Sequence, residues 1–236
     1  MAVLPVDAAG PLVVTTSVGH AAAELEPSEK IRAVVLDLTG VLTTDMQKEV
    51  PALAQALGVE ADEPTVRRIW EELYLPASLG RITADEFWHE FCLRLEGRCT
   101  NALLVERQWL GRIRLSEPDL GETLSRLKAR FRLGLLSNHI GRWARTLLES
   151  HDLNQYFDGI LISSDAGTRK PERSLYKSIC ATVGVPPSNS VYVADEEEDL
   201  VAAQSVGMTP IFIPGEDASS RIGNRIEAVS DLLTIL

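Results

Sequence analysis

The chain has 236 residues, 45% of them hydrophobic, and its 34 acidic and 23 basic side chains give a net charge of −11. This length is enough to bury a core and suits one large domain, or one domain with an inserted module. The negative charge argues against nucleic acid or an anionic membrane as a partner, and no apolar run approaches the roughly 20 residues of a membrane span. An anionic substrate would need a locally positive site or a metal ion.

The N-terminal segment and the cysteines bear on where the protein works. Residues 1–30 lack the basic start of a secretory signal, and acidic and proline residues interrupt their apolar part, so we expect a flexible N-terminal arm. The three cysteines are Cys92, Cys99 and Cys180. Their odd number and the lack of a CxxC pair favour buried free thiols over a disulfide framework. These features favour a cytoplasmic location.

Short apolar runs alternate with helical patterns along most of the chain. The runs expected to be strands are residues 31–37, 131–137, 159–163, 190–195 and 209–213. Most are apolar at successive positions, as in strands that are covered on both faces. The apolar residues expected to share one helix face are Leu120, Leu124 and Leu127 after a candidate N-cap at Asp119, then Leu175, Ile179 and Val183, then Ile222, Ile226, Val229 and Leu233. The alternation predicts an α/β fold, a Rossmann-like parallel sheet with helices on both faces.

One interval, residues 45–117, breaks this alternation because it contains amphipathic segments but no convincing strand. Within it, the stretch TADEFWHEFCLRL begins with Thr83 and Glu86, which are expected to form a capping box ahead of a helix. We therefore expect a small helical domain over residues 45–117. It would be inserted into an α/β core domain made of residues 31–44 and 118–236.

Polar residues recur at or just beyond the ends of the expected strands. Asp37 ends the run VVLD, and Asp195 ends VYVAD. Ser137 and Asn138 end the run GLLSN. Because the carboxyl ends of parallel strands lie along one edge of a sheet, we expect these side chains to converge there. Lys170, in the stretch RKP, is expected to join them.

These residue types suit one kind of chemistry. Asp37 could act as a nucleophile, the Ser137 hydroxyl could hold phosphate oxygens, and Lys170 could offset charge. Asp195 and Asp199 could help Asp37 to hold a hard dication, and Mg²⁺ best matches oxygen ligands. Without the cation, a carboxylate that attacks a phosphate dianion would face strong like-charge repulsion.

Each residue also has a structural explanation when it is taken alone. Asp37 before Gly40 could shape a turn, and Lys170 could be a solvated charge. Ser137 and Asn138 could cap the next helix. The joint occurrence of these residues, in order and each at a strand end, favours a catalytic site.

Four of these stretches together resemble the motifs of the haloacid dehalogenase superfamily of aspartate-nucleophile hydrolases. They are VVLDLTGVL, GLLSN, RKP and VYVADEEED, and the resemblance covers residues 31 to about 213. It implies that Asp37 attacks phosphorus and forms an aspartyl phosphate, while Ser137, Asn138 and Lys170 bind the substrate's phosphoryl group. The helical segment would correspond to the small cap that closes over the site in this family and selects substrates.

The resemblance also implies a Mg²⁺ site and one departure from the family pattern. Asp37, the backbone carbonyl of Thr39 and the carboxylate of Asp195 would hold the ion, and Asp199 would support that shell. Many phosphatases of the family carry Asp where this chain has Thr39, and that Asp protonates the leaving group and later activates water. Phosphatase turnover is therefore expected to be slow. Ion-pumping ATPases of the superfamily, which exploit a long-lived aspartyl phosphate, have Thr at the same spacing.

Other residues near the motifs are harder to place. His139 is a tempting substitute for the missing acid because its usual pKa lies near neutrality, but we expect it only to border the pocket. The tryptophans Trp70, Trp88 and Trp109 are expected to be core anchors first. The candidates for facing the substrate are Trp70, Tyr74, Trp88 and His89.

Three functions remain open at this stage. The leading hypothesis is a Mg²⁺-dependent phosphatase or phosphotransferase that acts on a small phosphorylated metabolite. The second is a hydrolytic dehalogenase that uses the same Asp37, because that branch also lacks an acid two residues later. Asp195 argues against the second, since dehalogenation needs no metal. The third is a binding or regulatory module without useful turnover, as Thr39 suggests.

Overall fold

A six-stranded parallel sheet forms the centre of the protein, in the strand order β3-β2-β1-β4-β5-β6. The computed structural model describes residues 31–50, 53, 63–95, 101–214 and 222–236, so the predicted N-terminal arm lies outside the described residues. The strands are β1 (Ala33–Leu36), β2 (Arg132–Ser137), β3 (Gly159–Ile162), β4 (Ser190–Ala194), β5 (Thr209–Phe212) and β6 (Asn224–Arg225). The five strands expected from the sequence are confirmed, and so is the Rossmann-like α/β class.

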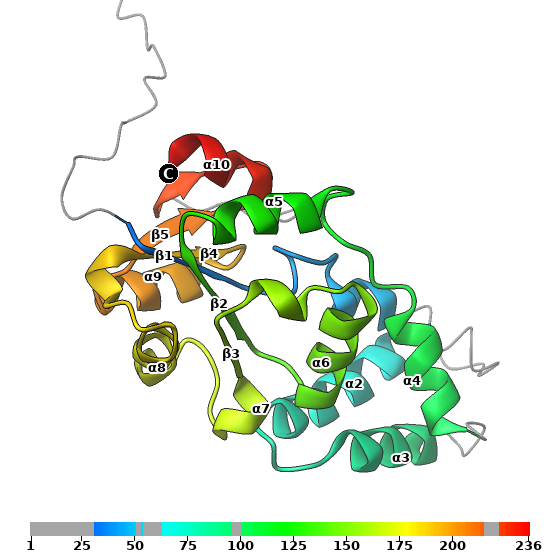
Figure 1. The fold of residues 1–236 in the computed structure, drawn as a ribbon. Helices are drawn as coiled ribbons and strands as arrows, with labels where there is room; N and C mark the ends of the chain where they lie inside the picture. The colour runs from blue at the N-terminus through cyan, green and yellow to red at the C-terminus, as the bar shows by residue number, and fades with distance from the viewer. Residues whose placement is uncertain (1–30, 51–52, 54–62, 96–100, 215–221) are drawn as a thin grey trace, which may run out of the picture.

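Helices cover both faces of the sheet, as predicted (Figure 1). The longer helices are α2 (Glu63–Ser78), α3 (Ala84–Arg94), α4 (Ala102–Leu110), α5 (Leu120–Lys128), α6 (Gly141–Ser150), α8 (Arg173–Val183) and α9 (Glu197–Ser205). The short ones are η1 (Met46–Glu49), η2 (Asn154–Tyr156), α7 (Ser163–Ala166), η3 (Pro187–Asn189), η4 (Val229–Asp231) and α10 (Leu232–Ile235). Helices α8 and α9 lie on one face, and α5 and α6 lie on the other (Figure 1).

Alternate residues of β1 show how the two layers form. Val34 and Leu36 belong to the larger apolar cluster, which includes the inner faces of α5 and α6. Ala33 and Val35 belong to the second cluster, with the inner faces of α8 and α9. All four side chains are fully buried, because successive side chains of a strand point to opposite faces and both faces are covered.

The segment between β1 and α5 is helical, as the sequence predicts. Helices α2, α3 and α4, which we call the α2–α4 segment, pack beside α6 at one end of the sheet (Figure 1). The predicted capping box is present, since Glu86 N donates to Thr83 Oγ1 at 3.1 Å and Thr83 N donates to Glu86 Oε2 at 2.7 Å. Whether this segment is a separate cap domain stays a prediction. Among the described residues, no helix is both long and apolar enough to cross a membrane.

The helix expected from Ile222 to Leu233 is wrong. Strand β6 forms there instead and pairs with β5, with Arg225 opposite Phe212. The following backbone amides donate to side chains, because the Glu117 carboxylate accepts from Val229 N and the Asp231 carboxylate accepts from residues 227 and 228. Because these amides bond to side chains and not to helix carbonyls, only η4 and the short α10 form here, although the apolar residues have helical spacing.

The expectation of free thiols is confirmed for one cysteine and wrong for another. Cys180 is a buried free thiol. Cys92 is disulfide-bonded. Cys99 lies outside the described residues. An odd number of cysteines requires one unpaired thiol, but it says nothing about whether the others pair, and this is why the count misled.

Candidate active site

The seven predicted site residues gather around one cavity at the carboxyl edge of the sheet. Strands β2, β1 and β4 are neighbours, so the residues that follow them meet at that edge. The cavity has a volume of about 200 Å³. The predicted residues that line it are Asp37, Thr39, Ser137, Asn138, Lys170, Asp195 and Asp199. We call this space the active-site cavity.

Lys170 is the centre of a buried charge network. Its Nζ forms an ion pair with the Asp37 carboxylate and a second with Asp199 Oδ2 at 2.6 Å. Nζ also donates to the Tyr192 hydroxyl at 3.0 Å, and the Tyr176 hydroxyl donates to Asp199 Oδ1 at 3.1 Å. Burial opposes the charged form of Lys170, but Asp37 and Asp199 outweigh it and raise its pKa. Lys170 is therefore a fixed cation beside Asp37.

Asn138 fixes the backbone that carries Lys170. Its Oδ1 accepts from Lys170 N at 2.8 Å, and its Nδ2 donates to the Lys170 carbonyl at 3.1 Å. The carbonyl of Asn138 in turn accepts from the Tyr74 hydroxyl of α2 at 2.8 Å. The side chain of Asn138, predicted to bind substrate, thus also holds the peptide of Lys170 in place.

The turn after Asp37 brings Asp195 close to it. The amides of Leu42 and Thr43 both donate to the carbonyl of Leu38 at 2.9 Å, which closes the turn tightly. Within it, Gly40 has φ +80°, and a Cβ at this position would lie 1.9 Å from Asp195 Oδ2. Only glycine fits both the backbone angle and the close approach of the carboxylate.

The single positive charge of Lys170 does not balance the acidic groups around Asp37. Burial raises the pKa of the Asp37 carboxyl, and the charge of Lys170 opposes this. Burial and then the negative charge of Asp37 raise the pKa of Asp195 to about 7. Asp37 thus disfavours the ionised form of the half-buried Asp195, and two neighbouring carboxylates of this kind are suited to share a cation.

The position two residues after Asp37 holds no acid. Thr39 lines the cavity, and its hydroxyl contacts the sulfur of Met46 at 3.6 Å. His139, expected to border the pocket, is fully buried and is not among the residues that line the cavity. Its Nδ1 bonds to the Ile140 carbonyl at 3.1 Å, and burial lowers its pKa to about 4. The structure thus places His139 in the core.

The aromatic candidates fall into core residues and one residue that lines the cavity. Trp70, Trp88 and Trp109 are at most 2% exposed, which confirms them as core anchors, and Tyr74 is the aromatic residue of the α2–α4 segment that lines the cavity. His89 lines a separate surface groove instead. Cavity residues that the sequence analysis missed are Asp45, Met46, Gln47, Arg169 and Glu196. Arg169 and Glu196 adjoin motif residues, so their place in the sequence was the available signal.

Comparisons with known proteins agree with the motifs. Residues 31–207 match the family model described as haloacid dehalogenase-like hydrolase. (S)-2-haloacid dehalogenase 4A of Burkholderia cepacia is 26% identical over 224 residues, which cover 88% of this chain and 96% of that protein. Sesquiterpene phosphatase astK of Aspergillus oryzae is 26% identical over 190 residues, which cover 77% of this chain and 89% of that protein.

Solved structures show the same fold. A HAD-family enzyme of Bacteroides thetaiotaomicron, in complex with magnesium and inorganic phosphate, has a TM-score of 0.67 at 20% identity and covers 80% of this chain and 98% of that one. L-2-haloacid dehalogenase of Xanthobacter autotrophicus has a TM-score of 0.61 at 19% identity, with 87% of this chain and 98% of that one covered. The relatives include dehalogenases and phosphatases. With its ordered motifs, its parallel sheet and a family match over residues 31–207, the chain belongs to the haloacid dehalogenase-like hydrolases.

Proposed function

We propose that the protein is a Mg²⁺-dependent phosphatase or phosphotransferase that acts on a small phosphorylated metabolite through an aspartyl phosphate on Asp37. The observation that carries this proposal is the second carboxylate beside the nucleophile. Asp195 is held against the turn after Asp37, and burial and Asp37 raise its pKa to about 7. Lys170 pairs with both Asp37 and Asp199, so its single positive charge is already shared between two carboxylates. Ionised Asp195 therefore needs another cation.

The donor set suits Mg²⁺. We assign the carboxylates of Asp37 and Asp195 and the backbone carbonyl of Thr39 to the ion. Mg²⁺ usually takes one or two carboxylates and completes its shell with waters and substrate phosphate. In the part of the chain that the structure describes, no group of three or more His, Cys, Asp or Glu side chains is placed to hold a metal, so a full protein cage is not offered. When bound, the ion would offset the negative charge of the phosphoryl group.

The contacts of Asp199 differ from those expected of a residue that directly supports the metal shell, the role that the family resemblance implies. Its two carboxylate oxygens are occupied by Lys170 and by the Tyr176 hydroxyl. We therefore propose that Asp199 holds Lys170 in position and supports the metal site only through that contact.

The proposed reaction uses the residues as follows. Leu38 N donates to Asp37 Oδ1 at 2.7 Å and Lys170 contacts Oδ2, so the carboxylate is held in one orientation for attack on phosphorus. The bond from phosphorus to the ester oxygen breaks, and the oxygen leaves as the alcohol with a proton from solvent. Ser137 donates to the phosphoryl oxygens, while Lys170 offsets their charge from its place beside Asp37. Water then attacks the aspartyl phosphate, which releases inorganic phosphate and restores Asp37. A phosphotransferase would use an acceptor hydroxyl in place of water.

Thr39 limits the rate of this cycle. Its hydroxyl forms hydrogen bonds but does not exchange a proton near neutral pH, so the leaving alcohol and the attacking water both lack a partner at this position. Slow turnover of alkyl esters follows. The same residue favours the second candidate, in which Asp37 displaces halide from carbon and water hydrolyses the resulting ester, as the similarity to a 2-haloacid dehalogenase suggests.

A panel of phosphate monoesters, assayed for phosphate release with Mg²⁺ and with EDTA, tests the proposal. We expect activity only with Mg²⁺, loss of activity in Asp37→Asn, and wild-type activity in Asp119→Asn, which changes an exposed carboxylate that does not line the cavity. Chloride release from 2-chloropropanoate in EDTA, without phosphatase activity, would establish the dehalogenase instead. Mg²⁺ binding with neither reaction would leave a binding or regulatory module.

A further inference from the structure

A second cation lines the active-site cavity. Arg169 directly precedes Lys170, is half-buried, and faces the same space. Lys170 is occupied by its two carboxylates and Tyr192, whereas the guanidinium of Arg169 makes no ion pair or side-chain hydrogen bond with any residue that the structure describes. The positive charge of Arg169 is therefore available to a ligand.

The position of Arg169 is set by its neighbours. Asn138 bonds to both the backbone amide and the backbone carbonyl of Lys170. The side chain of Arg169, the preceding residue, therefore starts from a backbone that is held in place. Arg169 and Tyr74 of α2 both line the active-site cavity. Arg169 thus lies where the α2–α4 segment meets the core.

The cavity is also small and acidic. Its volume of about 200 Å³ is below the roughly 300 to 1,000 Å³ of pockets for drug-sized ligands, so it suits a substrate of few atoms. Asp45 and Glu196 also line the cavity and would repel a second dianionic phosphate. A carboxylate carries a single charge, and its planar shape pairs with a guanidinium through two hydrogen bonds.

We propose that Arg169 binds a carboxylate of the substrate, so that the substrate class is a short phosphorylated carboxylic acid. The phosphoryl group lies at Asp37, and the carboxylate lies at Arg169. This inference rests on the proposed function, and Arg169 is the residue that sets specificity within it.

Two esters that differ in one group test the inference: the phosphate of 3-hydroxypropanoate and the monophosphate of propane-1,3-diol. The wild type should prefer the carboxylated ester in kcat/KM by about 10- to 100-fold. Arg169→Gln should abolish this preference, because the loss in kcat/KM should be about 10- to 100-fold larger for the carboxylated ester than for the diol ester. Arg169→Lys should keep part of the preference because the charge remains but the planar fork is lost.

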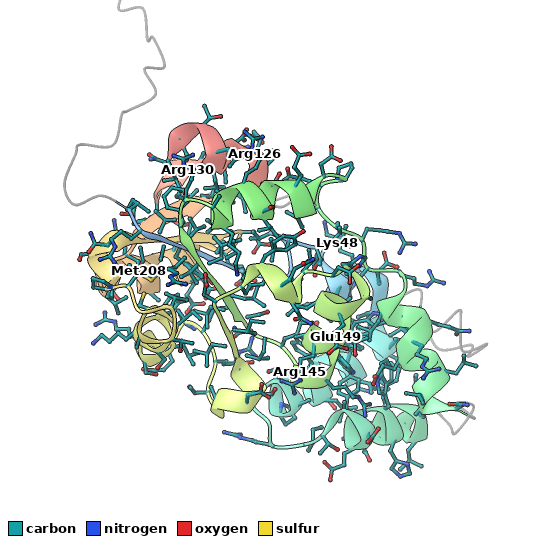
Figure 2. All side chains as sticks on the ribbon, viewed as in Figure 1. Lys48, Arg126, Arg130, Arg145, Glu149 and Met208 are labelled. Carbon is teal, nitrogen blue, oxygen red and sulfur yellow. The ribbon has the colours of Figure 1, made fainter. Side chains whose placement is uncertain are left out.

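A matched control is Arg126→Gln, which removes an exposed arginine on α5, near α10 and away from the α2–α4 segment (Figure 2). It should keep the wild-type preference. No preference in the wild type, or an equal loss on both esters in Arg169→Gln, overturns the role of Arg169 while hydrolysis of the esters leaves the proposed function standing.

Calorimetry separates the two proposals when turnover is lacking. Binding of both esters to Asp37→Asn, with and without Arg169→Gln, measures recognition without hydrolysis. Tighter binding of the carboxylated ester that depends on Arg169, combined with an inactive wild type, would reject the phosphatase and support the carboxylate site. Binding that is equal for both esters, or absent for both, rejects the carboxylate site.

Discussion

Glu106 of α4 accepts a hydrogen bond from Trp143 of α6 at 2.8 Å, and this contact joins the α2–α4 segment to the core. The same oxygen, Oε2, accepts from Trp88 of α3 at 2.7 Å and from Arg142 at 2.6 Å. Glu106 is only 4% exposed. One buried carboxylate therefore holds three helices together through donors from each side.

Replacement of Glu106 by Gln should lower the free energy of unfolding by about 2 to 4 kcal/mol, because Arg142 and the two indoles lose a charged acceptor in a buried site. Urea denaturation followed by tryptophan fluorescence measures the loss. The exposed Glu122→Gln on α5 serves as the control and should change the value by less than about 0.5 kcal/mol. Equal stabilities of the two variants would show that Glu106 does not hold the helices together.

His139 should make the protein less stable as the pH falls. Burial lowers its pKa from 6.5 to about 4, so between these values the unfolded chain binds a proton that the folded protein does not. The free energy of unfolding should fall by roughly 3 kcal/mol from this group as the pH drops through that window, and its contribution is complete above about pH 6.5. His139→Asn should show a shallower dependence in urea titrations at pH 7 and pH 4.5. If the free energy of unfolding changed with pH by the same amount in both proteins, the prediction would be contradicted.

Asp195→Asn should weaken Mg²⁺ binding by at least about 10-fold, since the amide removes one of two anionic ligands. Folding should be affected little or improved, because the change removes a half-buried carboxylate whose pKa is already raised to about 7. Isothermal titration with Mg²⁺ and thermal melts of both proteins provide the two readouts. If mutant and parent bind Mg²⁺ equally, Asp195 is not a ligand.

Thr39→Asp should raise the hydrolysis of alkyl phosphates more than that of aryl phosphates. Positioned acid and base catalysis is typically worth about 10²- to 10⁴-fold, and aryl leaving groups need less protonation. The phosphoenzyme of the wild type should also persist, because the attacking water lacks its base. Steady-state kinetics on both ester classes and trapping of the phosphoenzyme by acid quench measure these effects.

The outcome for Thr39 can also point to another acid. If the wild type already hydrolyses alkyl phosphates rapidly and Thr39→Asp gives no gain, a different group supplies the proton. His139 is buried outside the cavity, so Asp45, a half-buried carboxylate on the cavity wall, becomes the first residue to replace. Asp45→Asn should then reproduce the slow turnover.

The sequence predicted the features that follow from strand burial and from the parallel direction of the strands. The run that ends at Asp37 is apolar on both faces because helices cover both sides of β1, and so its strand was visible. A parallel sheet brings its strand ends to one edge, so the convergence of Asp37, Ser137 and Asp195 followed from their positions alone. Predicting that they converge required no knowledge of side-chain contacts.

Other features depend on contacts that no local pattern encodes. The apolar spacing from Ile222 to Leu233 is helical, yet Glu117, more than a hundred residues earlier, accepts from the amide of Val229. Tyr176 and Tyr192 have the spacing of core residues, and their hydroxyls reach the buried charges only in the folded protein. Arg169 was overlooked for a related reason, since an arginine beside a motif lysine gives no sign of which one is already paired.

The hydrogen bond from Tyr74 to the carbonyl of Asn138 connects α2 to the nucleophile through a continuous chain of contacts. Asn138 grips the peptide of Lys170, and Lys170 contacts the carboxylate of Asp37. If α2 shifted enough to break the Tyr74 hydrogen bond, Asn138 would lose one of the contacts that fix it beside Lys170. A substitution in α2 that displaces Tyr74 is therefore expected to alter the charge environment of Asp37 although it touches no active-site carboxylate.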